Sequence, residues 1–514
     1  MDIHDLDFPI LQFPSSAHEQ STWTIRHAVE GVQIFGGIGS GKTSGSGRML
    51  ALKYLKTGFG GLVLTAKPDE KELWQQYCAE TNRTKDLVII EPNGKYSFNF
   101  LEYESTHTDS NEAITENIVQ VLKTVIRAGS EKDSAKGDDP FWESALDMLI
   151  FNVIDLCKIA YGSVSVQMMY DIVQTLPKAT DPLPPSKENE DDENEDGEKS
   201  EVTAFLKAYD LAYDRTYEKI DIWDNTLTSH EKEELEKNDL YFHEAMNNVA
   251  EARLLKFLGE FFFDSFKNLS PKTRSIIEFT FTGFLFRLLR EPIYSMFCRN
   301  KSNITPDDCL NGKIIVVNLP VKVYHKVGRD CQILFKYIWQ RAMEKRNINN
   351  NRRPLFLWAD EAQNFLHEHD AEYQATARSS RISTVYISQN LPNYYASMGG
   401  QKGEYRVKSF LGTLGTKIFH ANADIETNKY ASELIGDTTF FDPSRTITTS
   451  TEFSQSDSLS LKIDRHVRPE KFISLKTGGA KNKFRVEGYF HRQGDSLSGK
   501  KNFIKMDFDQ LFRP

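Results

Sequence analysis

Two kinds of hydrophobic pattern divide the chain. In the first hundred residues, and again after residue 303, short runs of apolar residues alternate with segments of helical periodicity. Continuous apolar runs of this length are typical of strands that are buried on both faces of a parallel sheet. Strands that alternate with helices predict a doubly wound α/β sheet. The runs are Val32–Phe35, Leu62–Thr65, Leu87–Glu91, Ile314–Leu319, Leu355–Ala359, Thr384–Ser388 and Thr416–His420.

The central part of the chain has a different pattern. Apolar residues recur there at helical spacing in Ile114–Ile126, Phe141–Ile159 and Ile276–Leu289, and strand-like runs are scarce. We therefore expect an all-helical domain, residues 104–303, that is inserted into one α/β domain. That α/β domain would consist of residues 31–103 and 304–514 and would follow an N-terminal segment, residues 1–30.

Two segments have the composition of irregular structure. Ala179–Ser200 is proline-rich and then acidic, which predicts a solvated, disordered loop, with a docking segment for a partner as the alternative. Within it and just beyond, Ser186–Glu201 carries nine acidic residues and two lysines, so about −3 of the net charge of −10 remains for the rest. Thr446–Ser460 is rich in serine and threonine, and we expect a mobile loop there.

Composition narrows the class of protein. Apolar residues make up 39% and charged residues 26% of the chain, as in ordinary globular proteins. The acidic balance argues against a generally basic, nucleic-acid-coating surface, although it allows a DNA path confined to an inner channel. The first residues show no signal peptide, and the most apolar stretch, Ile276–Phe297, is interrupted by charges. We expect a cytoplasmic protein with no membrane span of its own, in which five scattered cysteines stay reduced.

The clearest chemical motif is Gly36–Thr43, GGIGSGKT, which matches the phosphate-binding loop GxxxxGK[ST] between a predicted strand and a helix that runs to about Leu55. Its glycines let backbone N–H groups turn toward phosphate oxygens, and the following helix directs its positive end at them. We expect Lys42 to reach the β- and γ-phosphates of ATP and Thr43 to ligate Mg²⁺. The expected nucleotide-binding residues are Gly36, Gly37, Gly39, Ser40, Gly41, Lys42, Thr43 and Ser44.

A second half of such a site follows about 300 residues later, where the apolar run Leu355–Ala359 ends in Asp360 and Glu361. This is a Walker B pattern, in which Asp360 would hold the Mg²⁺ shell and Glu361 would orient the attacking water. The alternative is an acidic cap on the next helix. The long separation from the P-loop disfavours a compact small-molecule phosphotransferase, and no Ser/His/Asp triad stands out.

Further candidates lie on either side of the run Thr384–Ser388. Gln389, at its carboxyl end, could contact the γ-phosphate or its water, or could simply end the strand. Arg378 is a candidate arginine finger that acts on a neighbouring subunit's nucleotide, with Arg381 as the fallback and a plain surface arginine as the alternative. Lys67-Pro68-Asp69 either borders the nucleotide or makes a turn.

A metal site at His367 and His369 is disfavoured, because side chains two residues apart on a helix diverge.

Together, these motifs resemble the type IV secretion coupling proteins, the TraD/TraG-like conjugative ATPases of the HerA–FtsK superfamily. Beyond the P-loop and Walker B patterns, the resemblance rests on further segments and covers roughly residues 31–440. Phe100 departs from it where the family usually has proline. The family usually carries transmembrane helices before the motor, whereas here the P-loop begins at Gly36, so the chain resembles a form without them. The further segments are Leu62–Glu70, Tyr96–Leu101, Asp139–Trp142, Ser270–Pro292, Ala375–Gln389 and Leu411–Asp437.

The resemblance implies a RecA-like ATPase that assembles into a hexamer on its substrate and moves DNA, single- or double-stranded, or a relaxase-type nucleoprotein. It also implies a membrane-anchoring or secretion-channel partner at the inner face of the membrane. Candidate channel residues are Lys402, Arg406 and Lys408, although a solvated surface loop would also explain their charges. The alternative function is an ATPase platform that recruits a protein partner, a secreted effector or a defence nuclease, without moving DNA.

Overall fold

The structure is a computed structural model. It describes residues 4–13, 22–106, 111–130, 140–181, 203–398, 403–449, 453–494, 496–497 and 501–514. The chain divides into two compact units. The first, here called the sheet unit, comprises Met1–Gly94, Arg127–Ala135 and Thr305–Pro514. The second, the helical unit, comprises Lys95–Ile126 and Lys136–Ile304. That residues 104–303 act as a domain of their own stays a prediction.

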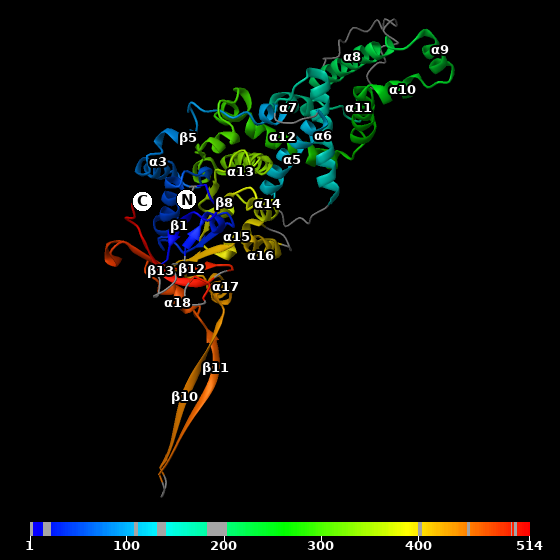
Figure 1. Cartoon of the computed structure of the whole chain (residues 1–514). Coiled ribbons are helices and arrows are strands. Elements are labelled where there is room, and N and C mark those ends of the chain that lie inside the picture. Colours follow the sequence, from blue (N-terminus) through cyan, green and yellow to red (C-terminus); the bar gives the residue numbers. More distant parts are fainter. Residues whose placement is uncertain are drawn as a thin grey trace. The chain divides into compact units, whose positions relative to one another are not determined.

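The described strands of the sheet unit form one nine-stranded sheet in the order β13-β12-β9-β3-β8-β7-β4-β6-β5. Figure 1 shows its edge strands β12 and β13 side by side. Neighbours pair in parallel from β9 to β5, while β12 and β13 add an antiparallel hairpin at one edge. The strands are β3 (Val32–Phe35), β4 (Gly60–Leu64), β5 (Leu87–Ile90), β6 (Ile314–Val317), β7 (Leu355–Ala359), β8 (Ile382–Ser388), β9 (Thr416–Phe419), β12 (Arg485–Arg492) and β13 (Phe503–Asp509).

This order confirms the predicted α/β fold of the RecA-like kind. The strand that ends in the P-loop, β3, does not pair with the Walker B strand β7, because β8 lies between them. An apolar run predicted each strand of the parallel part to within about two residues at either end. The runs are fully buried in β3, β4, β6, β7, β8 and β9, as expected of parallel strands covered on both faces.

Helices connect these strands. The helix α17 shows local start and stop signals: Asp424 caps its first turn by accepting from the amide of Thr427 at 2.8 Å, and Gly436 ends it with a φ of 88°. In α13 the backbone is non-helical at His325. The helices are α1 (Ile25–Ala28), α2 (Arg48–Lys56), α3 (Glu70–Glu80), α13 (Val321–Lys345), α14 (Asp370–Ala377), α15 (Leu391–Met398), α16 (Gly403–Thr413), α17 (Ile425–Ile435) and α18 (Glu470–Ile473).

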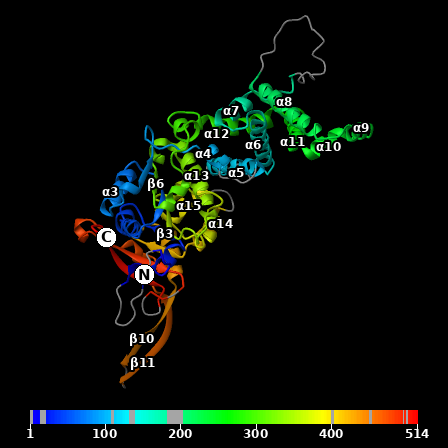
Figure 2. The same ribbon diagram turned by 45° about the horizontal axis from the view of Figure 1, so that its top comes forward.

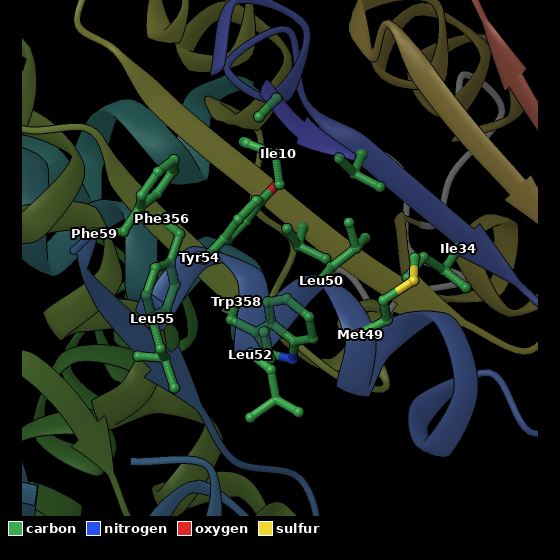
Figure 3. Close-up of a cluster of buried hydrophobic side chains, with 14 of the residues drawn as sticks. Ile10, Ile34, Met49, Leu50, Leu52, Tyr54, Leu55, Phe59, Phe356 and Trp358 are labelled. Atoms are coloured by element: carbon green, nitrogen blue, oxygen red, sulfur yellow. The ribbon is translucent and has the colours of Figure 1, made fainter. Parts of the chain in front are cut away.

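One face of α2 anchors the main hydrophobic cluster (Figure 3). Leu50 and Tyr54 are fully buried there, and the Tyr54 ring stacks on Phe59 at 4.6 Å between centroids. The Tyr54 hydroxyl shares a hydrogen bond of 2.8 Å with the hydroxyl of Ser383 in β8. Because α2 continues the helical turn at the end of the P-loop, this packing holds the P-loop against the middle of the sheet.

The N-terminal segment contributes to this same cluster. Its strands β1 (Pro9–Gln12) and β2 (Thr22–Thr24) pair antiparallel and bury Ile10 and Trp23. The Trp23 indole donates to the hydroxyl of Thr416 in β9 at 3.1 Å. This segment is thus part of the core of the sheet unit.

The described residues of the helical unit contain helices and no strands. Each predicted periodic segment lies in a helix, and Figure 2 shows α8, α10 and α11 next to one another. The acidic part of the predicted loop, from residue 182 onward, lies outside the described residues. The helices are α4 (Phe100–Thr106), α5 (Asn111–Ser130), α6 (Pro140–Tyr161), α7 (Val166–Gln174), α8 (Ala204–Asp224), α9 (Ser229–Lys237), α10 (Tyr241–Asn248), α11 (Ala250–Gly259) and α12 (Pro271–Leu288).

Within the described ranges, no single helix has the length and apolar composition needed to cross a membrane. Helices α6 and α7 have that length and composition only when they are taken together, and the chain bends by 111° between them.

The predicted mobile loop at Thr446–Ser460 is wrong for its described residues. They belong to a long two-stranded ribbon of β10 (Asp437–Thr449) and β11 (Phe453–Arg465), which Figure 1 shows as a twisted hairpin. Serine and threonine content hid an alternating pattern, because Leu459, Leu461 and Ile463 recur at every second position. Such alternation of apolar and polar residues is typical of a strand with one apolar face.

Candidate nucleotide-binding site

The P-loop follows β3 and turns directly into a helical segment, a π-helical turn at Thr43–Gly47 that continues into α2. The amide of Gly37 donates to the carbonyl of Ala421 at 2.8 Å, which ties the loop to the end of β9. Gly41 has a φ of +82°, and a Cβ there would lie 2.5 Å from the Val486 side chain, so only glycine fits. The backbone angle of Gly41 and its close contact with Val486 of β12 therefore both require glycine at this position of the loop.

The end of β7 brings the predicted metal ligands together. The Thr43 hydroxyl donates to Oδ2 of Asp360 at 2.9 Å, although the two residues are far apart in the chain. The other Asp360 oxygen, Oδ1, accepts from the amide of Glu361 at 2.9 Å. Asp360 is thereby oriented at the foot of the P-loop helix, where the sequence predicted it.

Glu361 and Gln389 also meet. The Gln389 amide lies 3.3 Å from Oε1 of Glu361, and the Gln363 amide donates to Oε2 at 2.8 Å. Glu361 has a φ of 50°, an uncommon conformation that turns it out of the strand. Burial raises its pKa, but the Gln363 hydrogen bond and the charges of Lys67 and Lys42 outweigh burial, so the pKa of Glu361 lies below its usual value. The carboxylate therefore stays ionised.

Two lysines supply the positive charge of the site. Burial lowers the pKa of Lys42, and the carboxylates of Asp360 and Glu361 oppose that shift. Burial acts on Lys67 in the same direction, but Asp360, Glu361 and Glu70 outweigh it and raise the pKa of Lys67 above its usual value. The Lys67 ammonium lies 3.2 Å from Oδ2 of Asp360. The sequence had left open whether Lys67 borders the nucleotide, and the structure places its charged end beside the Walker B residues.

A cavity of 650 Å³, the size class of a small-molecule site, lies between these residues. Sequence reasoning missed several of its lining residues, since Arg48, Tyr77, Lys322 and Gln510 belong to no motif. The Gln510 amide donates to the Ser44 hydroxyl at 2.7 Å, so the end of the described chain reaches the P-loop. The lining is Ile38, Gly39, Ser40, Gly41, Lys42, Thr43, Ser44, Arg48, Lys67, Asp69, Leu73, Tyr77, Lys322, Glu361, Gln389 and Gln510.

The residues present fit a nucleoside triphosphate with Mg²⁺. The Ser40 hydroxyl is buried and has no hydrogen-bond partner among the described residues, which suits an acceptor that arrives with the ligand. Open space surrounds Gly39, where a Cβ would meet nothing within 4 Å. Thr43 and Asp360 offer the oxygen donors that Mg²⁺ prefers, and the loop offers backbone N–H groups at a helix start.

Arg378 does not join this cavity. It caps the end of α14, before the amino end of β8, and its guanidinium lies 3.5 Å from Oε1 of Glu30. Because β8 has seven residues, its two ends are separated by roughly 20 Å. Arg378 thus lies near the amino end of β8, whereas Gln389 follows its carboxyl end, and the Arg378 side chain is 59% exposed. The fallback Arg381 donates to the carbonyls of His4 and Arg352, which gives it a structural role.

Two of the three candidate channel residues lie in the part of the chain that the structure describes. Lys402 lies outside the described residues. Arg406 and Lys408 lie on α16, so the surface loop considered for them is wrong from Gly403 onward. Lys408 pairs with Glu404 one turn away at 2.6 Å, a contact typical of an exposed helix face.

The histidines near Walker B have a packing role. No group of three or more possible metal ligands occurs in the part of the chain that the structure describes. Instead, Asp370 is fully enclosed: Lys336 lies 2.6 Å from Oδ1, and the backbone amide of His367 donates to Oδ2 at 2.8 Å. Burial lowers the pKa of His367 to about 3, so this imidazole is neutral. The cluster secures the loop after β7 against α13.

Comparisons with known proteins agree with this geometry. Residues 354–475 match the family model TraG-D_C, described as the TraM recognition site of TraD and TraG. No curated protein sequence matches the chain significantly. Among solved structures, plasmid coupling protein TrwB in complex with ADP and Mg²⁺ matches with a TM-score of 0.57 at 11% identity, over 98% of this chain and 94% of that one.

Two further structures of this kind match. The bacterial conjugative coupling protein TrwBdeltaN70, in its unbound monoclinic form, has a TM-score of 0.56 at 12% identity over 95% of this chain and 86% of that one. The complex of TrwB with the non-hydrolysable ATP analogue ADPNP has a TM-score of 0.56 at 12% identity, over 98% and 95%. The chain therefore has the fold of a conjugative coupling protein, and its residues 354–475 match a domain described for TraD and TraG.

Proposed function

We propose that this protein is an ATP-hydrolysing motor that couples a DNA or nucleoprotein substrate to conjugation or type IV secretion. The observation that carries the proposal is the meeting of Thr43, Asp360, Glu361 and Gln389 beside Lys42. They come from three separate segments, which follow β3, β7 and β8, and all but Asp360 line one cavity. If Asp360 and Glu361 served only to cap the next helix, they would not need to meet Thr43 and Gln389. Hydrolysis of a phosphoanhydride, in contrast, needs a metal ligand, a base and a residue that positions the water.

Each residue has a role that follows from its chemistry. Lys42 and the loop amides bind the phosphates, and Thr43 with Asp360 would hold Mg²⁺. When bound, that ion neutralises charge on the phosphoryl oxygens. Glu361, ionised and held by Gln363 and Gln389, orients a water and accepts its proton. Gln389 links this carboxylate to the end of β8.

The cycle would be completed between subunits. Arg378 cannot reach the nucleotide of its own chain, since it lies at the other edge of the sheet, while its exposure suits an arginine finger that acts on a neighbour. We therefore propose a hexameric ring, as the resemblance implies. Its substrate would contact Arg406 and Lys408, with Lys402, and the inserted helical domain, residues 104–303, would select the substrate at the cytoplasmic side of a membrane-anchored partner.

A second candidate is a platform that recruits a protein partner without moving DNA. The ribbon of β10 and β11 supports it, because Phe441, Leu461 and Ile463 are more than 60% exposed on it. The matched family model, which spans the ribbon, is described as a recognition site for TraM. An ATP-dependent step could serve either function, so the response to DNA distinguishes them.

The first experiment measures ATP turnover by the purified protein at fixed low salt, alone and with single- or double-stranded DNA. Lys42→Ala is the control for contaminating activity. DNA stimulation that is absent in Lys42→Ala supports the motor. Turnover that depends on Lys42 but ignores both DNAs favours the platform. Turnover that is as high in Lys42→Ala as in the unmodified protein comes from a contaminant, and the absence of any Lys42-dependent turnover contradicts both.

A further inference from the structure

The ammonium of Lys67 contacts the carboxylates of both Asp360 and Glu361, here called the Walker B pair. Its Nζ lies 3.2 Å from Oδ2 of Asp360 and 3.4 Å from Oε1 of Glu361. The two carboxylates are almost buried, at 5% and 10% side-chain exposure, whereas the Lys67 side chain keeps 26%. One flexible cation thus contacts both acids that the proposed reaction uses and offsets one of their two negative charges.

The backbone that presents Lys67 is firmly held. Thr65, two residues earlier, exchanges two hydrogen bonds with the buried side chain of Gln332 in α13, at 2.6 and 3.0 Å. The carboxylate of Glu70 accepts from the amides of Ala66 and Lys67, at 2.7 and 3.4 Å. Only the four-carbon side chain of Lys67 is therefore free to change direction.

The position of Lys67 conflicts with the proposed metal site. Oδ2 of Asp360 accepts from Thr43 at 2.9 Å and contacts Lys67 at the same time. Thr43 and Asp360 are the residues that would hold Mg²⁺, and a divalent ion beside this oxygen meets the ammonium at short range. Like charges a few ångströms apart repel strongly where water is scarce. The ion and the ammonium therefore cannot share this oxygen.

We infer that Lys67 is the resident counter-cation of the Walker B pair, which holds Asp360 and Glu361 in the nucleotide-free protein and must withdraw when Mg²⁺ enters. This inference rests on the proposed function, since it concerns the same site. Lys67 lines the nucleotide cavity, so its ammonium can turn toward the phosphate side. It is a positioning residue: it keeps Glu361 engaged until nucleotide and metal arrive together.

Lys67 should also weaken the binding of a divalent ion in the absence of nucleotide. As long as Lys67 neutralises Asp360, a divalent ion alone gains little there. Phosphate oxygens change this balance, because they offer the ammonium another partner and the ion more ligands. The protein would thus bind Mg²⁺ strongly only together with the nucleotide.

The test titrates nucleotide-free protein with Mn²⁺, a spectroscopic substitute for Mg²⁺, and follows bound Mn²⁺ by electron paramagnetic resonance. We expect Lys67→Met to bind Mn²⁺ at least tenfold more tightly than the unmodified protein, and Lys67→Arg to bind as weakly as the unmodified protein. The matched control is Lys71→Met, which removes a lysine of similar exposure that pairs with Glu91 at 2.8 Å outside the cavity. It should leave Mn²⁺ binding unchanged.

A second variant locates the site. In Lys67→Met combined with Asp360→Asn, the added affinity should vanish, and circular dichroism checks that each variant is folded. Equal Mn²⁺ affinity in Lys67→Met and the unmodified protein would overturn the inference, as would a gain that persists with Asp360→Asn. Neither result depends on ATP turnover or DNA, so the motor proposal can fail or stand separately.

Discussion

Two regions of the sheet unit, the nucleotide site and the ribbon of β10 and β11, are built in opposite ways. The site collects side chains from the ends of strands far apart in the chain, and its acids are almost buried. In the ribbon each residue pairs with one a short way along the same hairpin, and its apolar side chains are exposed, as in Ile463 at 72%. The arrangement of the nucleotide site therefore depends on the whole sheet, whereas the structure of the ribbon depends only on the pairing of its own two strands.

This difference separates long-range from local stabilisation. Burial of apolar surface around α2 stabilises the sheet and, with it, the distances in the nucleotide site. A two-stranded ribbon gains little by itself in water, and an exposed apolar face marks a surface that other molecules can cover. Changes in the site should therefore alter chemistry or global stability, whereas changes in the ribbon should leave both nearly unchanged.

The largest effect should come from Glu361→Gln. This change keeps the shape of the side chain but removes the base, so turnover should fall by about 10²- to 10⁴-fold while nucleotide binding persists. Steady-state ATPase assays, together with binding of a fluorescent nucleotide, measure the two quantities. Glu372→Gln, exposed on α14, is the control and should keep normal turnover. Unchanged turnover in Glu361→Gln would remove the residue from the proposed mechanism.

Core and ribbon should differ sharply in their response to the same truncation. Leu50→Ala opens a cavity beneath α2 and should lower the free energy of unfolding by about 2–5 kcal/mol. Leu461→Ala, on the ribbon at 61% exposure, should change it by no more than about 0.5 kcal/mol. Urea denaturation of the two variants gives both values. Equal losses would mean that the ribbon packs against a partner surface in solution.

Acid should weaken the region of the site through His420. Its Nδ1 donates to the carbonyl of Glu487 at 2.9 Å and its Nε2 accepts from the Ser46 hydroxyl at 2.7 Å. Burial lowers its pKa to about 4. As pH falls from about 6.5 to about 4, the unfolded chain binds a proton that the folded chain excludes, so stability decreases by about 3 kcal/mol at most.

The measurement is the free energy of unfolding between pH 7 and pH 4. His420→Gln should make this dependence less steep, while His367 and His491, whose pKa values burial also lowers, keep part of it. His230→Gln, which alters a side chain 87% exposed, should leave it unchanged. If the slope in His420→Gln equals that of the unmodified protein, the acid sensitivity has another origin.

The smallest effect is expected in the ribbon itself. Arg445 and Asp457 face each other across the strands at 2.8 Å, and both are about 60% exposed. Exposed pairs of this kind contribute less than about 1 kcal/mol, so a double-mutant cycle with alanine at both positions should give a coupling energy below that value. A coupling above about 2 kcal/mol would show that water does not reach this face.

How far the sequence predicted the site depended on how local each signal was. The P-loop is contiguous, and its glycines suit the backbone angles of Gly39 and Gly41. Asp360 and Glu361 followed from an apolar strand that ends in acids, and the structure brings them to Thr43. Their roles in hydrolysis, like that of Gln389, stay predictions.

Other residues carried no local signal. Gln510 reaches Ser44 only because β13 pairs with β12 at the sheet edge. The acids that Lys67 contacts follow β7, which the sheet order places beside β4. The ribbon was missed because serine and threonine content outweighed the alternation of its apolar residues.

By itself, the sequence determined which segments become the strands of the parallel part of the sheet, where the phosphate loop lies and that a second acidic strand end completes it. These properties arise from hydrophobic periodicity and backbone conformation within a few residues. The tertiary structure alone decided that β8 separates β3 from β7, that Arg378 faces away from its own cavity, and that Lys67 holds the Walker B pair. The order of strands in a sheet determines these neighbours, and that order depends on the packing of the whole unit.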